Sequence, residues 1–83
     1  LIWYLSLEVK MVDLDCIGKN IKSLRLSNGL TQVKLANKIS STQDTISLWE
    51  CGKSYPDAES LIVIAKFFNV TVDDLLNFKK QKV

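Results

Sequence analysis

From Ile17 to Leu76, apolar residues recur every three or four positions, and no stretch alternates apolar with polar residues. This period is typical of helices that bury one face. The chain has 83 residues, enough for a single domain with one modest core. Three glycines and one proline are too few for a turn-rich fold of many strands. The spacing therefore predicts a small all-α domain.

Turn and capping residues divide this region into five helices. Thr31, Thr42 and Asp57 are suited to open helices as N-caps, and Thr71 has an acid three residues later, as in a capping box. The helix-ending residues are Asn28-Gly29, Ser40-Ser41, Gly52 and Tyr55-Pro56. The predicted buried faces are Ile17, Ile21 and Leu24; Leu35, Ala36 and Ile39; Ile46 and Trp49; Ala58, Leu61, Ile62, Ala65 and Phe68; and Val72, Leu75 and Leu76.

The two ends of the chain differ from its middle. Between Leu5 and Met11, apolar and polar residues alternate as in a strand. Residues 1–10 therefore either form a short strand or are not native to the protein, with Met11 as the natural start. We expect an N-terminal extension over 1–16, a helical domain over 17–78 and a basic, frayed tail over 79–83. The apolar start is too short to cross a membrane and does not resemble a secretory signal.

The second and third helices are the most informative pair. Each has about eight or nine residues, and the short link between them predicts that they cross steeply, as in a helix-turn-helix. Ala36 allows close approach at the crossing, while Ile46 and Trp49 point to the core. The opposite face of the third helix then carries Gln43, Asp44, Ser47 and Leu48. Nine helical residues span roughly 13 Å, which suits a DNA major groove about 12 Å wide.

The run GLTQVKLANKISSTQDTISLWECGKSYPDAESL resembles the phage repressor and Cro (XRE-type) helix-turn-helix family of bacterial regulators. The similarity extends without gaps from Ile17 to Leu76. Its most specific parts are GLTQ, Leu35-Ala36, the pattern from Thr45 to Lys53, and the closing NVTVDDLL. The resemblance implies a five-helix, lambda-repressor-like DNA-binding domain that acts on transcription and is usually dimeric.

The resemblance also implies residue roles. Gln32 would bond a phosphate, Gln43 would read adenine, and Asp44 and Leu48 would occupy neighbouring base-reading positions. Arg25 would pair with Glu50 and tie the first helix to the third, in a pair whose burial the sequence leaves open. The flanking phosphate contacts would come from Thr42, Lys53 and Ser54.

Two departures from the family pattern bear on these roles. Ser40 stands where the family has glycine in a left-handed turn, at a cost of about 1–2 kcal/mol, and Ser41 replaces a small apolar residue. Asp44 repels phosphates but can accept a hydrogen bond from cytosine N4. An acid in the first helical turn is also favoured by the helix dipole alone, so both readings stay open.

Composition narrows the function classes. The chain has no histidine, no paired catalytic cluster and no phosphate-binding glycine loop, so we expect no enzyme, no cofactor and no metal site. Cys16 and Cys51 are interpreted as reduced cytoplasmic thiols. Residues 17–54 have more cations than acids, which suits a polyanion. The cations there are Lys19, Lys22, Arg25, Lys34, Lys38 and Lys53, against Asp44 and Glu50.

Two functions therefore remain. The first is a DNA-binding regulator, most simply a repressor, that works as a homodimer on a two-fold operator. The second is a protein-binding module on the same fold, such as an antitoxin that neutralises a toxin. Val63 and Phe67 lie four apart and off the predicted stripe of their helix, and an exposed apolar pair of this kind suggests a partner surface. Its candidate occupants are residues 1–11 or a second subunit.

Overall fold

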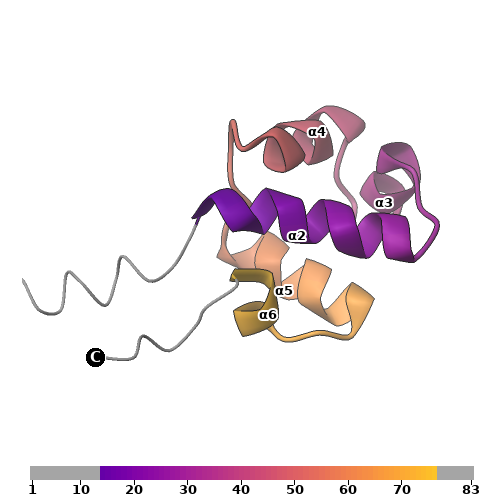
Figure 1. Ribbon diagram of the computed structural model, residues 1–83. Helices are drawn as coiled ribbons and strands as arrows, with labels where there is room; N and C mark the ends of the chain where they lie inside the picture. Colours follow the sequence, from indigo (N-terminus) through magenta and orange to yellow (C-terminus); the bar gives the residue numbers. More distant parts are fainter. Residues whose placement is uncertain (1–13, 77–83) are drawn as a thin grey trace, which may run out of the picture.

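The computed structural model describes residues 14–76, which form five helices without a strand (Figure 1). The prediction of a five-helix, all-α, lambda-repressor-like domain is confirmed. The predicted N-terminal strand and the basic tail lie outside the described residues. The helices are α2 (Leu14–Ser27), α3 (Gln32–Lys38), α4 (Gln43–Cys51), α5 (Ala58–Phe68) and α6 (Val72–Leu76).

In the view of Figure 1, α3 and α4 lie above α2, and α5 and α6 lie below it. Helix α2 begins at Leu14, three residues before the predicted start at Ile17. The expected division after residue 16 therefore falls inside this helix. An apolar stripe marks only the buried turns of a helix, so it does not locate the first turn.

Local signals set the other helix boundaries. Thr31, Thr42 and Asp57 are N-caps, and each side chain accepts a hydrogen bond from the backbone N–H three residues later. Thr71 and Asp74 exchange two such bonds, both of 3.1 Å, as the capping-box prediction requires. Gly52 closes α4 in the left-handed conformation, with φ of 77°.

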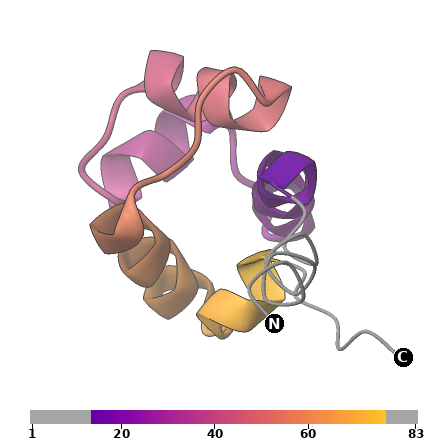
Figure 2. The same cartoon turned by 90° about the vertical axis from the view of Figure 1, so that its left-hand side faces the viewer.

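The core lies at the centre of a ring of helices (Figure 2). Each helix supplies one completely buried large side chain to it. These side chains are Ile21, Leu35, Ile46, Ile64 and Leu75. Because every helix contributes to the same cluster, the five short helices stabilise one another rather than folding separately.

The predicted buried face of α5 is partly wrong. Ile62 is 48% exposed and Ala58 is also exposed, whereas Ile64, absent from the predicted stripe, is completely buried. The run LIVIA is apolar on every side, so its periodicity does not distinguish the inner face from the outer one. The predicted exposure of Val63 and Phe67 is confirmed, at 39% each.

At Gly18, α2 packs directly against the backbone of α4. A Cβ atom added there would overlap the carbonyl oxygen of Trp49, so any larger residue would push the two backbones apart. The sequence does not predict this role, because a glycine within an apolar stripe gives no sign of what faces it. Gly18 therefore sets the distance at which α4 packs.

Within residues 14–76, no helix is both long enough and apolar enough to cross a membrane.

Candidate nucleic-acid interface

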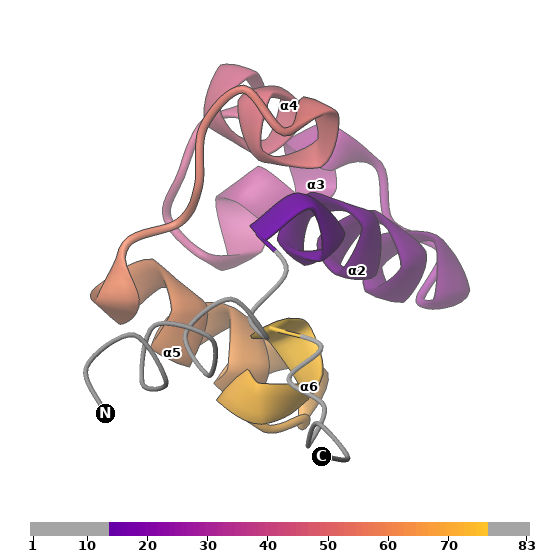
Figure 3. The same ribbon diagram turned by 60° about the vertical axis from the view of Figure 1, so that its left-hand side comes forward.

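Helix α4 has a buried inner face and an accessible outer face. Ile46 is completely buried and Trp49 is 5% exposed, so both pack in the core. On the opposite side, Gln43 and Asp44 are exposed, Leu48 is 43% exposed and Ser47 is half-buried. Figure 3 shows α4 at the edge of the molecule farthest from α5 and α6. The structure thus brings all four sequence-predicted reading residues to one outward surface.

The turn between α3 and α4 contains the predicted left-handed serine. Ser40 has φ of 57°, a conformation that costs a residue with a Cβ about 1–2 kcal/mol. The N–H of Ser41 donates to the carbonyl of Ala36 over 2.8 Å and closes the turn. Ala36 is 2% exposed at the base of this turn. Because its side chain is small, the two helices can pack closely there.

Arg25 and Glu50 form a buried, bidentate ion pair between α2 and α4. Arg25 donates from Nε to Oε2 of Glu50 over 2.7 Å and from Nη2 to Oε1 over 3.0 Å. The two side chains are 9% and 4% exposed. The hydrogen bonds to Glu50 raise the pKa of Arg25 above its usual value, against the opposing effect of burial. The pair is therefore in the buried regime, which the sequence left open.

A third donation from Arg25 holds the corner between α2 and α3. Its Nη1 donates to the carbonyl of Leu30 over 2.8 Å, just before α3 begins. The guanidinium of Arg25 thus bonds both Glu50 on α4 and the loop that leads into α3. Its planar fork geometry favours carboxylates. The positions of α3 and α4 relative to α2 therefore depend on the same side chain.

Gln32 extends this network to the outer surface. Its Nε2 donates to Oε1 of Glu50 over 3.1 Å, and its Oε1 accepts from Nε2 of Gln43 over 3.4 Å. Gln32 and Gln43 are the first residues of α3 and α4. The sequence predicts a phosphate contact for Gln32 but gives no sign of its bond to Glu50. Gln32 and Glu50 are 18 positions apart, so no local spacing indicates this bond.

The residues predicted to flank the interface lie at the two ends of α4. The Thr42 hydroxyl is a hydrogen-bond partner of Thr45, through its N–H and its Oγ1, so its first role is to cap the helix. At the other end, the N–H groups of Lys53 and Ser54 donate to the carbonyl of Leu48. Lys53 is exposed and Ser54 is half-buried. Cys51, the last residue of α4, has an exposed free thiol.

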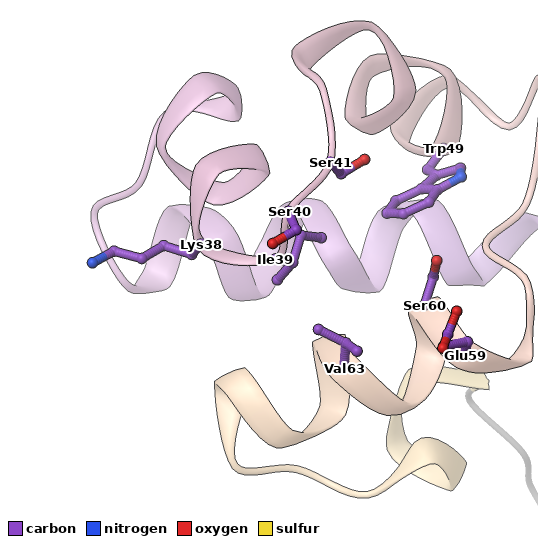
Figure 4. Close-up of a pocket in the computed structure, with 8 residues that line it drawn as sticks. All are labelled: Lys38, Ile39, Ser40, Ser41, Trp49, Glu59, Ser60 and Val63. Carbon is purple, nitrogen blue, oxygen red and sulfur yellow. The ribbon is translucent and has the colours of Figure 1, made fainter.

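A pocket of about 350 Å³ lies between the α3–α4 turn, Trp49 and α5. Figure 4 shows Trp49 and Val63 approaching it from opposite helices, while Lys38 points away. None of the outward reading residues lines it. Within residues 14–76, no three His, Cys, Asp or Glu side chains are grouped so that they could hold a metal ion.

Comparison with known proteins gives the family. A helix-turn-helix family model matches residues 21–75. The HTH-type transcriptional activator BcrR of Enterococcus faecalis is 46% identical over 60 residues, 72% of this chain and 29% of BcrR. Antitoxin PezA of Streptococcus pneumoniae is 38% identical over 64 residues, 77% of this chain and 40% of PezA. The chain thus spans less than half the length of either relative.

A solved structure has the same fold. The crystal structure of a transcriptional regulator from Listeria innocua matches 81% of this chain and 63% of its own, with a TM-score of 0.73. At 24% identity this likeness concerns the fold alone. The family match itself covers α3, α4 and α5 entirely and reaches into both α2 and α6. The chain belongs to the XRE-type, phage-repressor-like helix-turn-helix family of DNA-binding transcription regulators.

Proposed function

We propose that this chain binds double-stranded DNA by inserting the outer face of α4 into the major groove. The observation that carries the proposal is the division of α4 into a fully packed inner face and an accessible outer face. With nine residues, the helix is roughly 13 Å long, close to the groove width of about 12 Å. Direct reading of bases requires a rigid helix with a row of exposed side-chain ends.

The four outward residues have complementary chemistry. Gln43 offers the acceptor and donor that match N6 and N7 of adenine. Asp44 offers only acceptors and would accept from cytosine N4. The exposed methyl groups of Leu48 suit the C5-methyl of thymine, and the hydroxyl of Ser47 can donate or accept. Together these groups would read consecutive base edges.

Contacts to phosphates would hold α4 in this groove. The Nε2 group of Gln32 has two hydrogens and uses one for Glu50, so the other can donate to a phosphate oxygen. Lys53 and Ser54 follow α4 on an ordered loop, and Thr42 precedes it. When Thr45 donates to Thr42, the hydroxyl hydrogen of Thr42 is also available to a phosphate. These contacts fix the register of the helix without reading sequence.

We further propose a cytoplasmic repressor that binds a two-fold operator as a homodimer. Two copies would place their α4 helices about 34 Å apart, on half-sites one helical turn apart. Affinity would depend largely on cations that meet phosphates and would fall steeply with added salt. This assembly rests on the family to which the chain belongs.

The experiment is selection of bound duplexes from a random pool, followed by binding titrations at several salt concentrations. Gln43→Ala should relax the preference at one base pair, whereas Lys53→Ala should weaken binding to all duplexes alike and reduce the salt slope by about 1. Lys66→Ala, on α5, is the matched control and should change neither. Absence of salt-sensitive uptake of any duplex would overturn the proposal.

A second candidate is protein binding by the surface of α5. Val63 and Phe67 are both 39% exposed, and the Phe67 ring packs edge-on against Phe68 with 4.9 Å between ring centroids. PezA, which this chain resembles, is named an antitoxin. If the chain took up no duplex but suppressed the toxicity of a neighbouring gene product, and Phe67→Asp abolished that effect, this second function would replace the first.

A further inference from the structure

We infer that Glu50 sets the direction in which the side-chain amide of Gln43 is presented to DNA, and is therefore a specificity-positioning residue. The inference rests on the proposed DNA binding and concerns the chain of hydrogen bonds from Arg25 through Glu50 and Gln32 to Gln43. Glu50 itself is 4% exposed in its side chain and lies behind the reading surface. It acts through Gln32 and touches no base.

The direction of donation follows from the chemistry of the first link. A carboxylate has acceptors only, and both oxygens of Glu50 accept hydrogen bonds from Arg25. The end of Gln32 that lies 3.1 Å from Glu50 must therefore be its NH₂ group. The other end of the same amide, its carbonyl oxygen, must then face Gln43.

The same logic applies to the second link. A carbonyl oxygen can only accept, so Gln43 must turn its NH₂ group toward Gln32, as it does over 3.4 Å. This bond is the longest of the network and therefore its weakest link. Within the described residues, Oε1 of Gln43 has no hydrogen-bond partner. Gln43 thus presents one acceptor and one remaining N–H to the groove.

This ordered pair favours adenine over guanine. Adenine presents a donor at N6 beside an acceptor at N7, which match the free oxygen and the remaining N–H of Gln43. Guanine presents acceptors at both O6 and N7, so the Gln43 oxygen would face another acceptor. A glutamine free to rotate its amide would accommodate guanine by turning its NH₂ group outward. The buried carboxylate therefore disfavours guanine, a base that the Gln43 side chain alone would tolerate.

The test compares binding to two duplexes that carry adenine or guanine at one base pair. This is the base pair at which Gln43→Ala relaxes the sequence preference. With the full chain and the selected duplex, the wild-type protein should prefer adenine by at least about 5-fold. Gln32→Met, which keeps the side-chain length but breaks both links, should reduce this ratio at least about 3-fold. Glu50→Gln should also reduce this ratio, because the new amide can donate as well as accept and no longer fixes the orientation of Gln32. Asn37→Ala, an exposed change on α3, should leave it unchanged.

The ratio of adenine to guanine binding distinguishes a residue that orients Gln43 from one that only stabilises the fold or contacts a phosphate. Loss of a structural or phosphate contact would weaken binding to both duplexes equally and leave the ratio intact. If Glu50→Gln fails to fold, as circular dichroism would reveal, Gln32→Met decides alone, because Gln32 is only half-buried. An unchanged ratio in Gln32→Met, with the preference still lost in Gln43→Ala, would overturn this inference and leave the proposed function standing. Absence of any salt-sensitive DNA binding would overturn both.

Discussion

The two sides of α2 are held in different ways. On one side, α3 and α4 are tied to α2 and to each other by side chains far apart in sequence, such as Arg25 and Glu50, which are 25 residues apart. All four helices from α3 to α6 begin at local caps, and at α5 and α6 Asp57 and Thr71 each bond a residue three positions on. On the other side of α2, Asn20 supplies a long-range contact by donating to the carbonyl of Leu75 over 2.8 Å.

The difference fits the proposed function. Apolar burial depends on volume and pattern, and it tolerates small rotations of a helix. A bidentate ion pair fixes distance and angle together. Because successive residues on a helix point in different directions, a small rotation of α4 would move Gln43 and Leu48 away from the bases they would read. The reading side therefore needs polar constraints that α5 and α6 do not.

The largest expected effect comes from breaking the ion pair on the reading side. Arg25→Met should lower the free energy of unfolding by about 3–5 kcal/mol, because Glu50 would remain as a buried charge without its partner. Urea denaturation measures this loss. Lys22→Met, an exposed change on the same helix, is the control and should stay within about 0.5 kcal/mol. A loss of less than about 1 kcal/mol would mean that the pair behaves as an exposed one.

The next effect tests the face of α5. Ile64→Ala should cost about 2–5 kcal/mol because it empties a completely buried position, whereas Ile62→Ala should stay within about 0.5 kcal/mol. The two variants remove the same atoms from the same helix, so chemical denaturation of the pair isolates burial. Equal losses would contradict the observed orientation and restore the face predicted from sequence.

A smaller effect should follow from Gly18→Ala. Alanine favours a helix over glycine by about 1 kcal/mol, yet its Cβ would overlap the Trp49 carbonyl, so we expect a net loss of about 1–3 kcal/mol. Thermal unfolding measures it. Ser23→Ala, an exposed site on α2, serves as the control for helix propensity. A stabilised Gly18→Ala protein would contradict the close approach of α2 and α4.

The smallest effect concerns pH and the N-cap of α5. The backbone N–H of Ser60 donates to the Asp57 carboxylate over 2.8 Å and lowers the pKa of Asp57 below its usual value. A lowered folded-state pKa stabilises the protein above the unfolded-state pKa, and this contribution is lost as pH falls through the folded-state value. Unfolding measured as the pH is lowered below about 5 should therefore show a loss of stability that Asp57→Asn, which still caps the helix, lacks. Identical pH profiles would contradict this assignment.

Several features of this protein were decided by sequence alone. The predicted caps at Thr31, Thr42, Asp57 and Thr71 are confirmed, as is the end of α4 at Gly52, because each signal acts within three or four residues. The outward set on α4 was also predictable, because one buried pair, Ile46 and Trp49, fixes the phase of a short helix. Periodicity failed in α5, where apolar residues on every side leave the phase open.

Only the tertiary structure decided how these pieces are held together. Neither the role of Gly18 nor the bond from Gln32 to Glu50 has a local spacing that could reveal it, because each depends on what another helix places opposite. The same holds for the burial of Arg25 and Glu50, whose energetic effect depends on how completely five helices exclude water. Local backbone and capping energies thus specify where helices begin and end, whereas their mutual orientation follows from contacts that form only when the whole core is assembled.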